Sequence, residues 1–162
     1  MIDKIGFGGG CHWCTEAVFQ SLLGVERVEQ GWISSIFPFD SFSEAVIVHF
    51  NEDISLKILI EIHLLTHSST SMHSMREKYR SAIYFFKPED QKEIQLILDD
   101  LSEQNRQKYI TSVLPFIAFN ENKESQLDYY QKNKEGQFCQ TYIHPKLALI
   151  RNKFKKVSKL DF

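Results

Sequence analysis

Cysteine is scarce in this chain, whose 162 residues include three: Cys11, Cys14 and Cys139. An odd and sparse set argues against a framework of structural disulfides, and in a reducing compartment it suits reactive thiols or metal ligands. A chain of this length buries a substantial core without covalent crosslinks. The three sulfur atoms therefore call for a chemical explanation.

Long apolar runs are also lacking. No stretch of about eighteen apolar residues occurs, and the N-terminus MIDKIGFGGG has neither the basic nor the apolar segment of a secretory signal. These absences predict a cytoplasmic protein. A strong excess of one charge is missing as well, because the formal net charge is -2. We therefore expect neither nucleic acid nor a membrane surface as a partner.

Hydrophobic spacing predicts a single α+β domain over residues 1–162. Alternating, β-rich segments predict strands at residues 4–8, 25–34, 44–50, 80–86 and 109–119. Helical spacing predicts helices at residues 15–22, 55–66, 88–101, 125–133 and 145–156. This order favours one mixed or antiparallel sheet with helices packed against it. In the C-terminal segment 134–162, a turn places Cys139 in an exposed, mobile position.

The stretch GFGGGCHWCTEAVF joins the first strand to the first helix, and its chemistry centres on Cys11. If Cys11 lies at the helix N-terminus, free amide groups and the helix dipole favour the thiolate over the thiol. The glycines allow a sharp bend and leave room for a substrate beside the sulfur. Trp13 offers an apolar wall. The residues alone thus predict a reactive thiol at a strand-to-helix turn.

Other interpretations of this stretch remain open at this point. The glycines could form a tight turn that buries a small, inert Cys11. The CHWC spacing could supply two ligands to zinc, completed by His63 and His67 or by His73, although His63 fits a packed histidine better. CHWC also has the spacing of dithiol oxidoreductases, whose second cysteine resolves a mixed disulfide. None of the four prolines is a clear candidate for the cis-proline that faces the thiols in thioredoxin-like folds.

Four segments in order resemble one known family. GGGCHWCTEAVF, SEAVIVHF, EKYRSAIYF and DYYQKN with FCQTYIHPKL are similar to peptide methionine sulfoxide reductases of the A type, which act on the S epimer. The resemblance runs from about residue 5 to residue 154 and so covers nearly the whole chain.

The resemblance implies a role for each matching residue. The Cys11 thiolate attacks the sulfoxide sulfur and becomes a sulfenic acid, and Glu44 donates the proton that the oxygen requires. Tyr79 holds the sulfoxide oxygen, and Trp13 packs against the substrate methyl group. Cys139, or locally Cys14, then forms a disulfide with Cys11. A thioredoxin-like dithiol reduces that disulfide, and no cofactor or metal takes part.

Three positions depart from the family pattern inside the implied substrate site. His12 replaces the usual phenylalanine after the nucleophile and makes one wall of the methyl pocket polar and potentially cationic. Trp32 replaces a second oxygen-binding tyrosine. Ser74 replaces an aspartate that organises the site.

Two functions are consistent with these departures: an active reductase with altered substrate preference, or a silent paralogue that binds a ligand or senses oxidants. We predict the active reductase, acting on free or peptide-bound methionine sulfoxide as a monomer.

Overall fold

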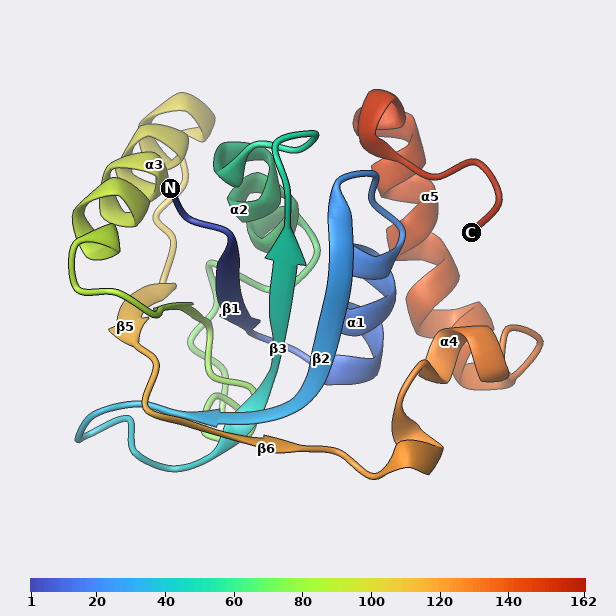
Figure 1. Cartoon of the computed structure of the whole chain (residues 1–162), viewed down its shortest axis with the longest axis horizontal. Helices are drawn as coiled ribbons and strands as arrows, with labels where there is room; N and C mark the ends of the chain where they lie inside the picture. Colours follow the sequence, from blue (N-terminus) through green and yellow to red (C-terminus); the bar gives the residue numbers. More distant parts are fainter.

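The computed structural model describes all 162 residues and contains a six-stranded sheet with helices packed against it (Figure 1). The sheet order is β5-β4-β1-β3-β2-β6. The strands are β1 (Lys4–Gly8), β2 (Val25–Ser34), β3 (Ser43–Phe50), β4 (Ala82–Phe85), β5 (Ser112–Pro115) and β6 (Ala118–Glu121). The α-helices are α1 (His12–Gln20), α2 (Leu56–Leu65), α3 (Asp90–Asn105), α4 (Tyr129–Lys132) and α5 (His144–Lys153). The predicted α+β class is confirmed.

The central strand β1 is antiparallel to both of its neighbours. Phe7 lies opposite Val46 of β3 and Ile83 of β4, and these three buried side chains share one face of the sheet. Phe7 also stacks on Phe19 of α1, with ring centroids 4.8 Å apart. Because successive residues of a strand point to opposite faces, this face forms the main core beneath the helices.

The opposite face of the sheet carries a smaller core. Ile33, Ala45 and Tyr84 are buried there, and Phe116 and Phe119 pack against them. The strands β5 and β6 occupy opposite edges of the sheet in the pairing order, although only residues 116 and 117 separate them in sequence, because the end of β2 bends toward β5 (Figure 1). Phe116 and Phe119, at this junction and in β6, cover the small core.

The prediction of a single strand at residues 109–119 is wrong, because this region forms two strands. The Phe116 N–H donates to the Phe85 carbonyl of β4 at 2.9 Å, whereas the Ile117 N–H donates to the Ser34 carbonyl of β2 at 3.1 Å. Pro115, which has no N–H for a ladder, ends β5 just before this change of partner. An apolar, alternating segment gives no sign that its two halves pair with different edges.

The predicted helices are all present, with shifted boundaries. The expected helix at residues 125–133 is divided into a 3₁₀ turn, Glu124–Gln126, and the short helix α4, because Asp128 between them adopts a left-handed conformation (φ 53°). A π-helical turn, Cys139–Ile143, leads directly into α5. None of the helices combines the length and apolar character that a membrane span requires.

Candidate active site

Cys11 is the N-cap residue of α1, as the sequence predicts. Its backbone is extended (φ -61°, ψ 128°), and its carbonyl accepts hydrogen bonds from the N–H groups of Cys14 and Thr15, at 3.1 and 3.2 Å. A Cβ on Gly9 would lie 2.4 Å from the His67 ring, whereas one on Gly10 would meet nothing within 4 Å. The turn therefore needs glycine at residue 9 and leaves open space immediately before the partly exposed Cys11.

The environment of Cys11 favours the thiolate. The pKa of Cys11 is lowered chiefly by a hydrogen bond from the Cys14 side chain, and also by the backbone N–H groups of Trp13 and Cys14. Burial and the nearby Glu44 oppose this effect, but they do not cancel it. The pKa of the Cys14 thiol is raised by its bond to Cys11 and by burial, so Cys14 keeps its proton and acts as the donor.

All three cysteines belong to one apolar cluster. Buried Cys14 and Cys139 pack with Tyr130 and Leu147, and Cys11 lies against the edge of this cluster. The three thiols are free. The expectation that Cys139 is exposed is wrong: its side chain is 0% exposed and belongs to the π-helical turn. The turn signal of NKEGQFC predicts the local bend, but burial of the sulfur depends on α1 packing against α5.

Glu44 lies near Cys11 although the two residues are 33 positions apart in sequence. Residue 45 of β3 pairs with Gly8 of β1, and this register places Glu44 at the start of α1. The carboxylate oxygen Oε1 accepts a hydrogen bond from the His12 backbone N–H at 3.2 Å, and Oε2 lies 3.7 Å from Lys78 Nζ. Glu44 is 7% exposed, so a carboxyl group is held out of bulk water next to Cys11.

His12 is not the cationic wall that the sequence suggests. Its ring is 5% exposed, packs edge-on against Trp32 at 5.0 Å, and places Nδ1 2.6 Å from the Gly31 carbonyl. Burial lowers the pKa of His12 and so favours the neutral imidazole. Its Nε2 lies 3.5 Å from Glu44 Oε1. The side chain is thus directed toward the carboxyl group.

Trp13 forms an aromatic wall with two residues that the sequence argument did not single out. Its ring stacks on Tyr129 at 3.9 Å, almost parallel, and meets Phe138 edge-on at 5.3 Å. The buried Glu16 holds this wall in place, because its carboxylate accepts hydrogen bonds from the N–H groups of Asp128 and Tyr129 at 3.0 and 3.1 Å. The segment DYYQKN, which carries part of the family resemblance, was the available signal for Tyr129.

The segment around Tyr79 is organised by a buried arginine. Arg76 donates to the carbonyls of Gly9 and Tyr79, each at 2.8 Å, and to those of Ser71 and Ser68. One guanidinium therefore joins the glycine turn before Cys11 to the half-buried Tyr79, a function that sequence reasoning missed.

Ser74 is exposed and makes no side-chain hydrogen bond, so the structure does not bring it together with the other site residues.

The histidines considered as zinc ligands have other partners. His63 is buried with Nε2 2.7 Å from the Gly8 carbonyl, which confirms a packed histidine. His67 places its ring nitrogens at the His63 carbonyl and at the Ser81 hydroxyl, at 2.5 and 2.8 Å. Nowhere do three side chains of the metal-binding types converge.

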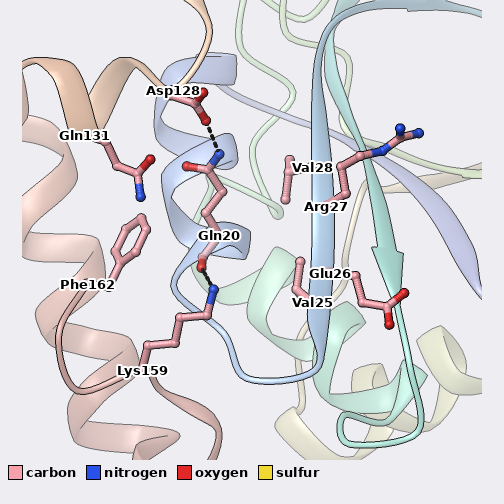
Figure 2. Close-up of a pocket in the computed structure, with 9 residues that line it drawn as sticks. All are labelled: Gln20, Val25, Glu26, Arg27, Val28, Asp128, Gln131, Lys159 and Phe162. Atoms are coloured by element: carbon pink, nitrogen blue, oxygen red, sulfur yellow. Dashed lines mark hydrogen bonds between the residues drawn. The ribbon is translucent and has the colours of Figure 1, made fainter.

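A pocket at the far end of α1 is separate from this site (Figure 2). There Gln20 Nε2 donates to Asp128 at 2.8 Å, and Lys159 Nζ donates to the Gln20 carbonyl at 2.8 Å. No cysteine lines this pocket. The reactive chemistry of the chain is therefore concentrated at the N-terminal end of α1.

The fold and the thiol site define a cysteine-based oxidoreductase, and comparison with known proteins supplies the family. The chain belongs to the peptide methionine sulfoxide reductase family, whose model matches residues 3–158. It is 31% identical to the peptide methionine sulfoxide reductase MsrA of Psychrobacter sp. (strain PRwf-1), over 96% of this chain and 98% of that protein. This family membership favours the predicted methionine sulfoxide reductase over the dithiol-oxidoreductase alternative.

Solved structures show the same fold. Reduced Mxr1 from Saccharomyces cerevisiae superposes with a TM-score of 0.74 at 23% identity, covering 86% of this chain and 90% of that one. Mxr1 in complex with Trx2 gives a TM-score of 0.60 at 22% identity, covering 76% and 81%. At these identities the likeness supports the fold alone.

Proposed function

We propose that this chain reduces methionine-S-sulfoxide, free or in peptides, through a sulfenic acid on Cys11. The observation that carries the proposal is the meeting of a favoured thiolate and a buried carboxyl group at one helix N-terminus. The thiolate attacks the sulfoxide sulfur while Glu44 protonates the oxygen, and methionine leaves as Cys11 becomes the sulfenic acid. The hydroxyl of Tyr79 steadies the oxygen, and Trp13 with Trp32 contacts the rest of the substrate.

A second thiol then converts the sulfenic acid to a disulfide and releases water. Cys139 and Cys14 are the two candidates, and their membership in one cluster with Cys11 supports both. We expect a thioredoxin-like dithiol to return the enzyme to its reduced form, by analogy with Mxr1, which forms a complex with Trx2. The reaction requires no cofactor beyond this reductant.

The test is a single turnover by fully reduced protein without recycling reductant. We expect about one methionine per protein from an S-sulfoxide peptide, none from the R epimer, and a disulfide at Cys11 detected by mass spectrometry. Cys11→Ser abolishes the product. Cys14→Ser and Cys139→Ser keep the first turnover, and the one that leaves Cys11 as a sulfenic acid identifies the resolving thiol. Absence of methionine from the wild type would overturn the proposal, and peroxide oxidation of Cys11 would then point to an oxidant sensor.

A further inference from the structure

The ammonium group of Lys78 lies among the groups that the proposed function assigns to the reaction. Its Nζ is 3.7 Å from Glu44 Oε2 and 5.1 Å from the centre of the Tyr79 ring. The same group forms a hydrogen bond with the Tyr79 side chain and is close enough to Cys11 for the charges to interact. One cation is therefore near the carboxyl group, the tyrosine and the reactive thiol of the candidate site.

The backbone of Lys78 is held firmly, although its side chain is 57% exposed. The Lys78 carbonyl accepts hydrogen bonds from the Glu44 N–H at 3.0 Å and from the Ser43 hydroxyl at 2.9 Å. Both donors belong to the first two residues of β3, and the carbonyl of the following residue, Tyr79, accepts from Arg76 at 2.8 Å. These contacts attach residue 78 to the start of β3, from which its side chain reaches the site.

The hydrogen-bonding groups of Lys78 are not all used within the protein. Its pKa is raised, chiefly by the hydrogen bond to the Tyr79 side chain and also by the proximity of Glu44, so the amine is protonated at neutral pH. An ammonium group has three N–H donors, and the Tyr79 hydroxyl accepts one of them. Glu44 Oε2 is beyond hydrogen-bond distance. A further N–H of Lys78 and the O–H of Tyr79 are thus available to an acceptor that enters the site.

The other basic side chains of the site are unsuited to bind such an acceptor. Arg76 is engaged by four backbone carbonyls. Burial lowers the pKa of His12 and favours its neutral ring. Lys78 is charged and faces the solvent from which a substrate enters. A substrate over Cys11 displaces part of this water, which strengthens the attraction between the ammonium group and a negative oxygen.

We propose that Lys78 is a further catalytic residue, whose ammonium group binds the sulfoxide oxygen. The proposal rests on the proposed function. In the net reaction Cys11–S⁻, R₂S=O and one proton yield Cys11–S–OH and R₂S. A sulfur–oxygen bond forms at Cys11 and the one in the substrate breaks, while two electrons pass from the cysteine sulfur to the sulfoxide sulfur.

The ammonium group acts on the charge that develops during this step. Negative charge moves from the Cys11 sulfur to the oxygen before the oxygen is protonated, and a positioned donor stabilises that charge more than it stabilises the bound sulfoxide. Lys78 keeps its own protons throughout. Its contribution therefore does not depend on which group delivers the proton to the oxygen.

The test compares single-turnover rates of the wild type, Lys78→Met and Lys78→Arg at saturating substrate. The substrate is the amide of N-acetyl-methionine-S-sulfoxide, which is uncharged, so attraction of a substrate carboxylate cannot contribute. We expect Lys78→Met to lower the rate about ten- to a hundredfold, because it removes the charge and the donors. Lys78→Arg keeps both and retains more of the rate. The contacts of the residue 78 backbone remain in both variants.

Alkylation of Cys11 by iodoacetamide separates an effect on the oxygen from an effect on the thiolate. The pKa of Cys11 is lowered chiefly by Cys14 and by backbone N–H groups. We therefore expect Lys78→Met to alkylate at about the wild-type rate. A decrease in alkylation as large as the decrease in reduction would overturn the proposal, because the lysine would then act on the thiolate.

Lys4→Met is the matched control. Lys4 Nζ also lies over an aromatic ring, that of Phe86, at 4.6 Å. Lys4 begins β1, however, whereas Gly8 at the other end of this strand leads to Cys11. We expect the control to reduce the sulfoxide at the wild-type rate.

The outcomes distinguish this proposal from the proposed function. A wild-type rate in Lys78→Met, or equal decreases in Lys78→Met and Lys78→Arg, would overturn the role of the ammonium group while the wild type still forms methionine. Absence of methionine from the wild type would overturn the proposed function and this inference with it.

Discussion

Cys11 and His12 are neighbours at the start of α1, yet their side chains enter opposite environments. Cys11 lies against an apolar cluster with Cys14 and Cys139, which we call the thiol side. His12 faces Glu44 and Asn122 in a hydrogen-bonded network, which we call the proton side. A helix start separates consecutive side chains by about 100°. In the proposed mechanism, this separation places the thiol that attacks the sulfoxide and the carboxyl group that supplies the proton on different sides of the helix start.

The two sides are stabilised differently. On the thiol side, burial raises the pKa of Cys139 and, with the bond to Cys11, that of Cys14, so only Cys11 is favoured as the thiolate. On the proton side, the buried polar atoms of His12, Asn122 and Gln30 are joined by oriented hydrogen bonds, because an unpaired buried polar group is costly. The comparison predicts that a substitution on one side changes the chemistry of that side much more than the chemistry of the other.

The largest expected effect comes from replacing the carboxyl group of Glu44 on the proton side, and it is a decrease in the single-turnover rate. Glu44→Gln retains an acceptor for the His12 N–H but has no proton to donate, so the single-turnover rate falls by about 10²- to 10⁴-fold. Because Glu44 raises the pKa of Cys11, the same variant alkylates slightly faster at neutral pH. The two measurements therefore move in opposite directions, and a parallel decrease of both would contradict the separation.

The second largest expected effect is on the aromatic wall formed by Trp13, Tyr129 and Phe138. Glu16→Ala leaves the N–H groups of Asp128 and Tyr129 without their acceptor, and we expect the free energy of unfolding to fall by roughly 2–3 kcal/mol. Urea unfolding measures this change. Glu16→Gln retains one good acceptor and loses about half as much. Equal stability of all three proteins would show that Tyr129 is held by its stacking alone.

A smaller effect is expected from a substitution on the thiol side, where the pKa of Cys11 changes. Cys14→Ala removes the hydrogen-bond donor, so the pKa of Cys11 rises and alkylation at pH 7 slows, by about tenfold for each unit of the rise. The pH dependence of iodoacetamide alkylation measures the shift. Cys139→Ala is the matched control, since Cys139 is not among the groups that influence Cys11. A shift of similar size in the control would assign the effect to burial of the cluster.

The smallest expected effect concerns His67, whose ring packs against Gly9 in the turn before Cys11. Burial lowers the pKa of His67 to about 4, below its unfolded value of 6.5. The unfolded chain therefore binds more protons between these values, and stability decreases as the pH falls from about 6.5 to 4. His67→Gln should flatten this decrease by at most about 1 kcal/mol per pH unit, measured by urea unfolding. An unchanged slope would show that His67 does not titrate on unfolding.

Much of the fold could be predicted because its elements are locally encoded. The apolar spacing of α2 and α3 and the β-rich segments of β1 to β4 correspond closely to the observed elements. The errors in the predicted secondary structure fall where a segment depends on residues far away in the sequence or on a single backbone conformation. The division of residues 109–119 depends on two sheet edges, and the break before α4 depends on the conformation of Asp128.

The candidate site also contains residues that the local sequence predicts and residues that it does not. The position of Cys11 at a helix start and that of Trp13 two residues later follow from a glycine run before a helical pattern. Arg76 and Asn122 carried no signal, because a buried guanidinium or amide resembles a surface residue until its acceptors are located. Ser74 shows the opposite error, since an alignment position need not keep its contact when the surrounding loop has changed.

The sequence by itself determined the position of Cys11 before a helix, the helix itself and the class of the fold, because these depend on residues close together in the chain. Only the tertiary structure decided that Glu44 meets His12 and that Cys139 is buried beside Cys14. Those contacts depend on the register between β1 and β3 and on the packing of α5 against α1. Strand register and helix packing join residues that are tens of positions apart, and they arise from burial of the whole core.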